Sequence, residues 1–528
     1  MNRFIRRANQ RVGLGNAATL LVATSIFGLM LGFLRTKLIN ANFSALGPSS
    51  TDTYFAAFKI PDFFFFTLAA GALGVAFMPV LSDRLEKGDK QDVWELASSL
   101  LNFLAVIMLI VAIIVLVFAR PLIHYVVAPK LSPEQLNNAV MIMRLLALNP
   151  LLFTISGILS SVQQTFGRFF FYAVAPLFYN ISIIISIFLF KNNIGIVGLG
   201  IGAMIGALLQ LLVVFMGIYG MSFKYHTKIN MKNANFRLIL KQLPPRSIDQ
   251  GIDSINSIVE TNLARGIGEG YLSYYENAYV LYMAPVLLIG TTISTAAFPR
   301  LTKRLSSNRP DLFKKDFLYV LQTMIWIALP VVTICYFCRG YLARLIFTRD
   351  APEIAMIFGF LAGAIFFRIL YTIISRYFYA QKNVRTPLYV SIFAIILNIF
   401  LAYTLSRPSA YGVVGLAMAQ SIVAASEVFI LLVVMLYKDL HLFDREFMSN
   451  FGRTLSATGF TILSAFIMIS LLPLVISDRG LILIVKLSVI SLVTLGTHLF
   501  ASWLFGLEES KMVVNKMGRF ILKPIKIQ

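Results

Sequence analysis

Long apolar runs recur along the whole chain. Each run has about 20 residues, the length that an α-helix needs to cross the hydrocarbon core of a bilayer. Runs such as 101–118 and 195–219 do not alternate between polar and apolar residues, as membrane-spanning β-strands would. The pattern therefore predicts an all-α polytopic membrane protein with about fourteen transmembrane helices. The predicted spans are 14–34, 54–81, 95–118, 137–160, 169–190, 195–219, 244–264, 272–298, 316–338, 353–375, 387–406, 411–437, 454–476 and 481–505.

Composition and charge agree with this pattern. Of the 528 residues, 58% are hydrophobic and 13% are charged, and the formal net charge is +22. In a soluble protein such a charge would favour nucleic-acid binding. With both termini in the cytoplasm, 30 of the 46 Lys and Arg residues fall in inner segments and 11 in outer segments. The positive-inside rule thus accounts for the charge and predicts cytoplasmic termini, and we expect no nucleic-acid partner.

A faint internal repeat predicts the domain organisation. The connection after the fourth span contains Arg168 and leads to Pro176, and the connection after the tenth contains Arg385 and leads to Pro387. Both connections are short and basic, and they lie six spans apart, so they share one orientation. The repeat predicts two pseudosymmetric six-helix lobes, although proline is common in the first turn of any helix and coincidence is the alternative. The predicted domains are an N-terminal lobe (1–220), a C-terminal lobe (221–440) and a C-terminal helix pair with a basic tail (441–528).

The chain shows no catalytic motif. A Walker loop, an HExxH motif, a nucleophile elbow and a dinucleotide fingerprint are all missing from the sequence, so we expect a transporter rather than an enzyme. Cys335 and Cys338 form a CxxC pair, but two thiols alone cannot complete a four-ligand zinc site. We therefore expect no metal and no cofactor, and a bound monovalent cation is the one option left open.

The seventh predicted span carries an ionisable stripe. At 3.6 residues per turn, Arg246, Asp249, Asp253, Asn256 and Glu260 fall on one side of the helix. Four ionisable groups facing lipid would cost roughly 10 kcal/mol or more. The favoured interpretation is a hydrophilic cavity whose carboxylates bind a cation or a proton. A surface amphipathic helix and a buried polar seam between helices are the alternatives.

A second charged cluster lies in the first two spans. It contains Arg35, Asp52, Lys59 and Asp62, and Pro61 is expected to break the second helix early. Lys59 and Asp62 are one turn apart and could form a purely structural pair. Arg35 lies at a span end and could instead extend to the interface. Charged residues in later predicted spans include Arg368 and Lys486.

At these residues the sequence resembles the MurJ/MviN family of lipid II flippases, within the MATE-like exporter superfamily. The matching segments are Leu31–Arg35, Thr51–Pro61, Gly71–Pro79, Ala175–Pro176 with Asn180, Leu281–Tyr282 with Pro285, Phe298–Leu301, and Arg376–Ala380 followed by Thr386–Pro387. The resemblance implies fourteen helices in two lobes plus a C-terminal pair. It also implies movement of a lipid-linked peptidoglycan precursor across the bacterial cytoplasmic membrane.

The resemblance assigns expected roles to the charged residues. Arg35, Asp52, Lys59 and Arg246 are the expected substrate-binding residues of a central cavity, where cations would meet an anionic pyrophosphate. The expected ion-coupling residues are Asp249, Asp253, Glu260 and Asn398. The expected partners are membrane lipids and the lipid-linked precursor, and the protein is expected to be a monomer. Because no ATP-binding motif is found, an ion gradient or the membrane potential is the expected driving force for alternating access.

Several positions depart from the family pattern. Cationic family positions are occupied here by Leu29, Phe65, Phe66 and Val280, and an acidic one by Ala70. The expected cavity is therefore less cationic and more acidic than the resemblance implies. Three alternatives stay open: a MATE-like cation or drug antiporter, an oligosaccharide-lipid exporter, and a non-transporting scaffold with the same fold.

Overall fold

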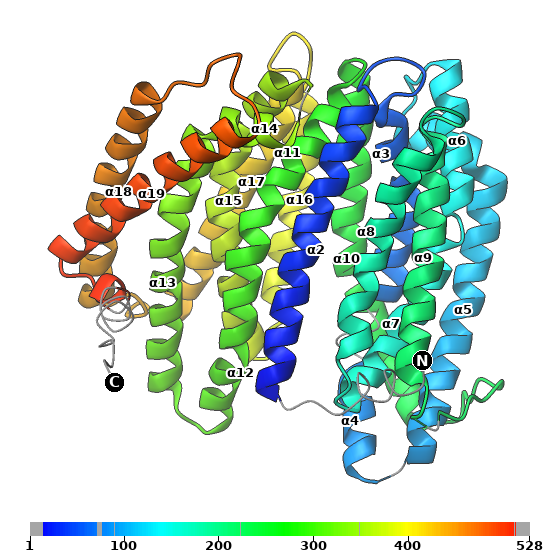
Figure 1. The fold of residues 1–528 in the computed structure, drawn as a ribbon. Helices are drawn as coiled ribbons and strands as arrows, with labels where there is room; N and C mark the ends of the chain where they lie inside the picture. Colours follow the sequence, from blue (N-terminus) through cyan, green and yellow to red (C-terminus); the bar gives the residue numbers. More distant parts are fainter. Residues whose placement is uncertain are drawn as a thin grey trace, which may run out of the picture. The chain divides into compact units, whose positions relative to one another are not determined.

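Helices make up all the regular secondary structure in the described part of the computed structural model (Figure 1). The structure describes residues 14–70, 77–88, 90–221, 223–347, 349–511 and 513. Within these ranges, the side chains of 14–18, 70, 79, 90, 242 and 244–250 are not described. The chain divides into two compact units, Met1–Ser273 and Tyr274–Gln528.

The described part of the first unit contains a bundle of long helices with short π-helical turns. Its elements are α2 (Leu14–Asn42), α3 (Thr51–Phe64), η1 (Phe65–Ala70), α4 (Met78–Glu86), α5 (Lys90–Pro121), η3 (Leu122–Val127), α6 (Pro133–Leu146), α7 (Asn149–Thr165), α8 (Phe170–Phe190), α9 (Val197–Ile218) and α10 (Ala234–Ile267). Helix α8 packs along α9 on one side and α2 on the other, as Figure 1 shows.

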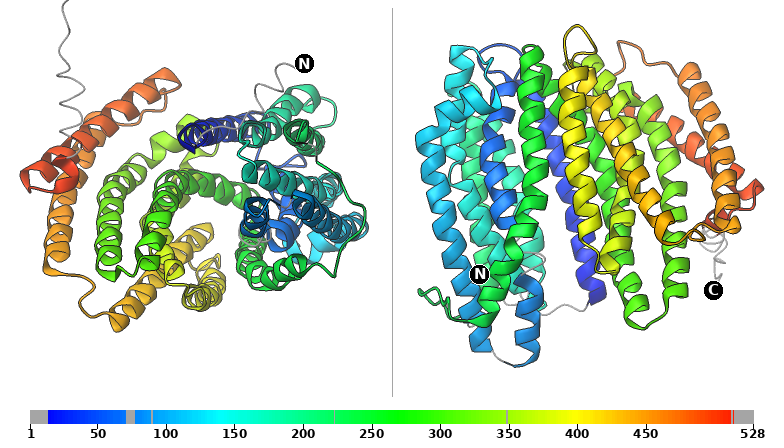
Figure 2. Two further views of the ribbon diagram at one scale, coloured as in Figure 1. Left: turned by 90° about the horizontal axis from the view of Figure 1, so that it is seen from below. Right: turned by 180° about the vertical axis from the view of Figure 1, so that it is seen from behind.

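The second unit is also built from helices that pack along one another. Its elements are α11 (Tyr271–Pro285, which begins at the boundary), η4 (Val286–Thr291), α12 (Thr292–Ser306), α13 (Pro310–Phe337), α14 (Arg339–Ile346), α15 (Ala351–Ala380), α16 (Arg385–Leu405), α17 (Val413–Lys438), α18 (Arg445–Leu471) and α19 (Leu481–Leu504). Helix α17 packs against both α15 and α16, while α18 lies beside α19 and against α13 (Figure 2).

The all-α membrane fold predicted from the sequence is confirmed. Twelve helical segments among the described residues are long and apolar enough to cross a membrane, and each corresponds to a predicted span. The two other predicted spans correspond to α3–η1–α4, of which residues 71–76 lie outside the description, and to α10. These two segments differ in character: α10 is polar along its length, whereas in α3–η1 the charged Lys59 and Asp62 are followed by a run of apolar residues. They are also the segments in which the sequence analysis placed most of its ionisable residues.

The outer faces of the helices carry large apolar side chains. Val117 on α5, Phe429 on α17 and Leu492 on α19 expose 62%, 67% and 70% of their surface in the protein alone. Such extensive apolar exposure is unfavourable in water, since contiguous patches of this kind mark contact with a partner or a membrane. Lipid is therefore the medium to which these helices are adapted.

Proline affects α3 less than the sequence analysis predicted. The helix is not broken at Pro61: it continues to Phe64 and then widens into the π-helix η1. The N–H of Phe65 still finds the carbonyls of Pro61 and Asp62, so the helical hydrogen bonding is carried past the proline. Proline thus removes one donor from the helix without ending it.

The segment before α10 is held against α5 by hydrogen bonds. Asn102 on α5 donates to the carbonyl of His226 at 2.8 Å, and the N–H groups of His226 and Asn230 donate to Ser98 and Ser99, both at 3.1 Å. Helix α10 then packs against α3, η1 and η3. The boundary between the compact units therefore follows α10, whereas the predicted lobe boundary at 220/221 precedes it. The lobe assignment concerns the repeat and stays a prediction.

Candidate functional site

A pocket of about 280 Å³ lies in the first unit between α3 and α10. Members of both charged clusters predicted from the sequence line it. Its walls combine charged and hydroxyl side chains with two aromatic rings. The lining residues are Lys59, Asp62, Phe63, Phe66, Asp253, Ser254 and Ser257.

Local sequence brings the two walls of this pocket together. Lys59 and Asp62 are one helical turn apart on α3, and Asp253 and Ser257 are one turn apart on α10, so each pair shares a helix face. Gly251 allows the close approach of the two elements: a Cβ there would lie 2.9 Å from the hydroxyl of Thr67. A larger residue at this position would push α10 away from η1.

The pocket joins one cation to two carboxylates. The Nζ of Lys59 donates to the hydroxyl of Ser257 at 2.8 Å, and its side chain is half-buried. Asp253 is exposed, and Asp62 is half-buried on the facing helix. A set of carboxylate and hydroxyl oxygens can hold a monovalent cation, and a half-buried ammonium can bind phosphate as a point charge.

Glu260 lies nearby on α10 but does not line this pocket. It is buried and accepts a hydrogen bond from Asn256 Nδ2 at 3.1 Å. The ionisable stripe predicted for the seventh span thus includes an exposed member, Asp253, and a buried member, Glu260. Within the described residues, no group of three or more His, Cys, Asp or Glu side chains is placed to hold a metal ion.

Asp52 lies at a separate site at the start of α3. It is completely buried and accepts hydrogen bonds from the Gly270 N–H at 2.8 Å, the Ser273 N–H at 2.8 Å and the Ser273 hydroxyl at 2.6 Å. The Nε of Arg265 lies 3.7 Å from its second oxygen. The carboxylate of Asp52 therefore ties the start of α3 to the segment after α10, and it does not line the pocket.

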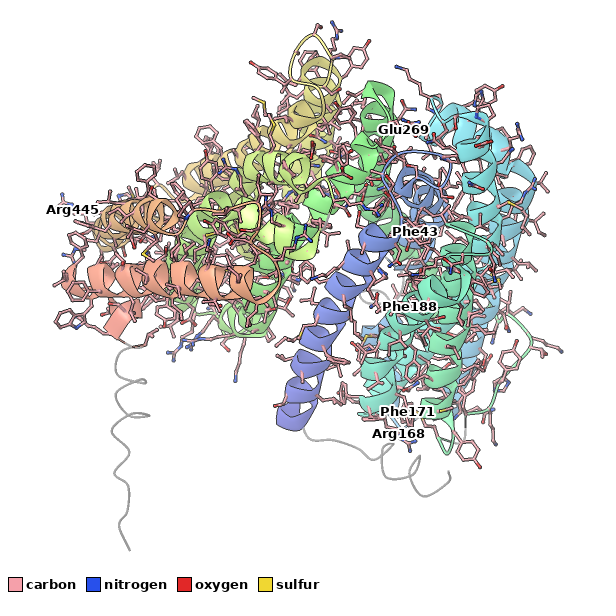
Figure 3. All side chains as sticks on the ribbon, turned by 45° about the horizontal axis from the view of Figure 1, so that its top comes forward. Phe43, Arg168, Phe171, Phe188, Glu269 and Arg445 are labelled. Carbon is pink, nitrogen blue, oxygen red and sulfur yellow. The ribbon has the colours of Figure 1, made fainter. Side chains whose placement is uncertain are left out.

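A polar network extends from this carboxylate. The guanidinium of Arg265 donates to Gln135 Oε1 at 2.7 Å, and the amide of Gln135 donates to Glu269 and to the Gly47 carbonyl. Glu269 also accepts from the Gly47 N–H at 2.8 Å. Figure 3 shows Glu269 at one end of the first unit and Arg168 at the other. The network thus closes the end of this unit opposite the basic connection at Arg168.

The other predicted site residues fall in several places. Arg35 on α2 is half-buried, and its Nε makes no hydrogen bond. Arg35 does not belong to the lining of the pocket, but it interacts electrostatically with Tyr54 and Tyr179, as Asp62 does. Asn398 is buried in α16 of the second unit. The side chains of Arg246 and Asp249 lie outside the described residues.

Aromatic packing occupies the positions where the family pattern has cations. The ring of Phe65 contacts those of Phe66 and Phe153, with centroids 5.4 Å and 5.7 Å away. Phe66 also lines the pocket. An apolar wall beside Lys59 lowers the local dielectric and strengthens the interaction of that cation with an anion.

The sequence analysis missed a buried cluster in the second unit. Glu427 on α17 is 2% exposed, pairs with Arg368 Nη1 at 3.0 Å and accepts from the Ser391 hydroxyl at 2.9 Å. The hydroxyl of Tyr371 lies 3.0 Å from that of Ser391. The signal for this cluster was a single acidic residue inside the predicted span 411–437. The same reasoning that singled out Arg368 would have found it.

Solved structures show the same fold. One described as lipid II flippase MurJ in an inward closed conformation superimposes with a TM-score of 0.75 at 23% identity, covering 92% of this chain and 98% of that one. An inward-facing multidrug resistance MATE family transporter gives a TM-score of 0.65 at 15% identity, covering 80% of this chain and 98% of its own.

Sequence relatives extend over most of the chain. A protein of Buchnera aphidicola named "Probable lipid II flippase MurJ" is 26% identical over 391 residues, which are 72% of this chain and 76% of the relative. A protein of the same name from Borreliella burgdorferi is 25% identical over 414 residues, 76% of this chain and 79% of the relative. The model of the family described as "Lipid II flippase MurJ" matches residues 44–503. This chain therefore belongs to the lipid II flippase MurJ family.

Proposed function

We propose that this protein is a flippase that moves a lipid-linked peptidoglycan precursor across the bacterial cytoplasmic membrane. The observation that carries the proposal is the match of the lipid II flippase family to residues 44–503, nearly the whole chain. The protein is a multi-pass membrane protein whose helices expose apolar faces. The precursor joins an anionic diphosphate to a long apolar tail, and such a molecule needs a polar passage bordered by lipid.

Lys59 and Arg35 are the proposed head-group residues. Lys59 lines the pocket between α3 and α10, where its hydrogen bond to the neutral hydroxyl of Ser257 can be exchanged for an ion pair with phosphate. Arg35 on α2 carries a buried Nε with no hydrogen bond. An incoming phosphate would satisfy that donor.

Asp253 and Glu260 are the proposed ion-coupling residues. They lie two turns apart on α10, one exposed to the pocket and one buried. Occupation of Asp253 by a monovalent cation or a proton would neutralise one of the two carboxylates that line the pocket with Lys59, and so would favour binding of the anion. Asn398 and Asp249 are kept as proposed contributors, and Arg246 as a proposed substrate contact.

The network around Asp52 is proposed to close the outer end of the first unit. It joins the start of α3 to the residues after α10 through a buried carboxylate, and the predicted topology puts both segments at the outer side of the membrane. Alternating access would require these hydrogen bonds to break when that end opens. Their loss would be offset by substrate or ion binding, which is how a ligand shifts a two-state equilibrium.

A direct transport assay tests the proposal. The full-length protein is reconstituted into liposomes with a fluorescent lipid-linked precursor, and the fraction of label accessible to an impermeant quencher is followed with time. We expect flipping by the natural chain and a loss of about 10-fold or more in Lys59→Met, because a charge-assisted hydrogen bond is worth about 1.5–3 kcal/mol. Lys59→Arg should keep most of the activity.

The matched control is Lys191→Met. Lys191 is another lysine of the first unit, and it does not line the pocket. Its Nζ donates a 2.9 Å hydrogen bond to Asn42 Oδ1. Its removal should leave flipping unchanged. Equal activity in Lys59→Met and the natural chain would contradict head-group capture by Lys59, and no flipping by the natural chain would contradict the function itself and favour the scaffold alternative.

A MATE-like cation or drug antiporter is the second candidate. The observation that favours it is that two carboxylates, Asp62 and Asp253, line the pocket, whereas Lys59 is the one basic residue among its described lining residues. Depletion in the host separates the two functions. Accumulation of lipid-linked precursor supports the flippase, whereas hypersensitivity to cationic drugs without such accumulation supports the antiporter.

A further inference from the structure

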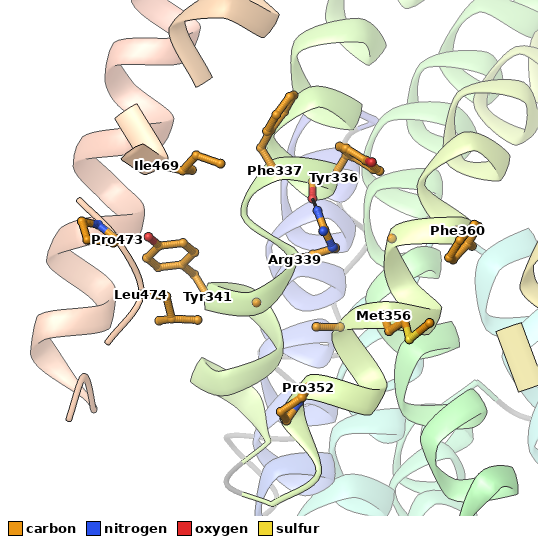
Figure 4. Close-up of a pocket in the computed structure, with 13 residues that line it drawn as sticks. Tyr336, Phe337, Arg339, Tyr341, Pro352, Met356, Phe360, Ile469, Pro473 and Leu474 are labelled. Atoms are coloured by element: carbon orange, nitrogen blue, oxygen red, sulfur yellow. Dashed lines mark hydrogen bonds between the residues drawn. The ribbon is translucent and has the colours of Figure 1, made fainter. Parts of the chain in front are cut away.

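The second unit contains a larger pocket away from the site described above. It has a volume of about 590 Å³ and lies where α13, α14, α15 and the end of α18 meet (Figure 4). Its size is that of a small-molecule binding site. The residues that matter here are Tyr336, Arg339, Tyr341, Met356, Phe360 and Leu474.

The ends of three membrane-spanning helices show at which level of the membrane this pocket lies. Helix α13 ends at Phe337, α15 begins at Ala351 and α18 ends at Leu471. The short helix α14 connects the first two, so the pocket lies at the boundary between hydrocarbon and water. Lipid head groups occupy this level, and the predicted topology places it on the outer face.

One wall of the pocket is apolar and open to the surroundings. Tyr336, Met356 and Phe360 are each 44–56% exposed although they belong to membrane-spanning helices. On the opposite side, Tyr341 donates its hydroxyl to the carbonyl of Leu472 and so fixes α14 to the end of α18. The pocket is therefore a lipid-facing recess whose opposite side is held by the hydrogen bond between α14 and the end of α18.

Arg339 provides the polar end of the recess. Its Nη1 donates to the Tyr336 carbonyl at 2.7 Å, and the guanidinium lies 4.9 Å from the centroid of the Tyr336 ring. Within the described residues, Arg339 forms no ion pair with a carboxylate, unlike the nearby Lys486, which lies 2.6 Å from Asp478. The remaining guanidinium N–H groups have the geometry to bind a phosphate.

We infer that this recess binds an anionic phospholipid of the outer leaflet. The phosphate lies on the guanidinium of Arg339, and an acyl chain lies along Met356, Phe360 and Leu474. Charge complementarity selects an anionic over a zwitterionic head group, and the exposed apolar wall selects a molecule with a hydrocarbon chain. The site is separate from the pocket between α3 and α10 and does not rest on the proposed function.

Photo-crosslinking tests the assignment. The full-length protein in nanodiscs is exposed to phosphatidylglycerol that carries a photoreactive acyl chain, or to phosphatidylcholine with the same chain, and the crosslinked peptides are mapped. We expect phosphatidylglycerol to mark residues 352–360 and 469–474 several-fold more than phosphatidylcholine. Arg339→Gln should lower the affinity for phosphatidylglycerol about 10-fold, the effect of one charge-assisted hydrogen bond.

Three further variants keep the test independent of folding. Arg479→Gln removes an exposed arginine from the neighbouring loop and should leave labelling unchanged. Met356→Glu places a negative charge on an exposed wall position and should weaken labelling, while Met356→Lys should strengthen it. Equal labelling by the two lipids, or an unchanged affinity in Arg339→Gln, would overturn the inference. Stronger competition by an isoprenoid diphosphate than by unlabelled phosphatidylglycerol would overturn the choice of occupant.

Discussion

Individual carboxylates in this chain are stabilised in different ways according to their depth. Asp52 is fully buried and receives three hydrogen bonds from residues 270 and 273. Asp83 is exposed on α4 and pairs with Lys87 at 2.9 Å across one helical turn. Burial makes the first arrangement essential, because a buried charge without partners costs several kcal/mol, whereas an exposed pair contributes little.

Asp52→Asn should therefore lower the stability of the protein by about 2–3 kcal/mol. The amide offers one acceptor oxygen, and its NH₂ group would face the backbone donor of either Gly270 or Ser273, so at least one buried donor loses its partner. Thermal unfolding of the purified protein in detergent measures the effect. Asp83→Asn, the exposed control, should change stability by less than about 0.5 kcal/mol. An unfolding temperature equal to that of the natural chain would show that the charge of Asp52 is dispensable.

Contacts between helices depend on small residues at defined positions. Helices α16 and α17 are joined by a tight turn, after which Gly415 lies directly against the end of α16. A Cβ at this position would lie 2.1 Å from the carbonyl oxygen of Leu405. Backbone atoms cannot move aside as a side chain can, so a larger residue must separate the two helices.

Gly415→Ala should destabilise the second unit by about 1–3 kcal/mol. The matched control is Gly459→Ala in the middle of α18, where an added Cβ meets nothing within 4 Å. There the substitution should stabilise the helix by about 0.5–1 kcal/mol, since alanine restricts the unfolded chain and favours the helix. Unfolding in a denaturant series compares the two variants. If both variants shifted stability in the same direction, the close approach of α16 and α17 would be irrelevant to stability.

Membrane topology is a property of the whole molecule. Helix α10 is polar along its length and α3 carries charged residues, and the crossing of these two segments decides the side on which every later connection lies. If both cross, the connection near residue 46 lies outside the cell, and the connections near residues 232 and 307 lie in the cytoplasm. The excess of Lys and Arg in the predicted inner connections favours this arrangement.

Cysteine labelling in intact cells tests this topology. An impermeant maleimide should label Leu46→Cys directly, but Lys232→Cys and Ser307→Cys only after the membrane is permeabilised. The two natural cysteines are buried and give little background. Labelling of residues 46 and 232 from the same side would mean that α3 does not cross, and labelling of 232 and 307 from opposite sides would mean that α10 does not cross.

The sequence alone determined the helices, because lipid leaves the backbone little choice. A segment of about 20 apolar residues must pair its own N–H and C=O groups, so length and hydropathy are sufficient to place it. The same reasoning identified α3 and α10 as the helices that carry buried charge. The prediction that Pro61 breaks α3 failed, because helical hydrogen bonding resumes after the proline, where the N–H of Phe65 bonds to the carbonyls of Pro61 and Asp62.

Only the tertiary structure decided which charged residues meet. Asp52 and Lys59 are seven residues apart on one helix, yet Asp52 binds residues 265–273 while Lys59 binds Ser257 on the pocket wall. Glu427 meets Arg368 from a helix 59 residues further along the chain. Helical periodicity fixes the face on which a side chain lies, but its partner is set by long-range packing, and no local pattern contains that information.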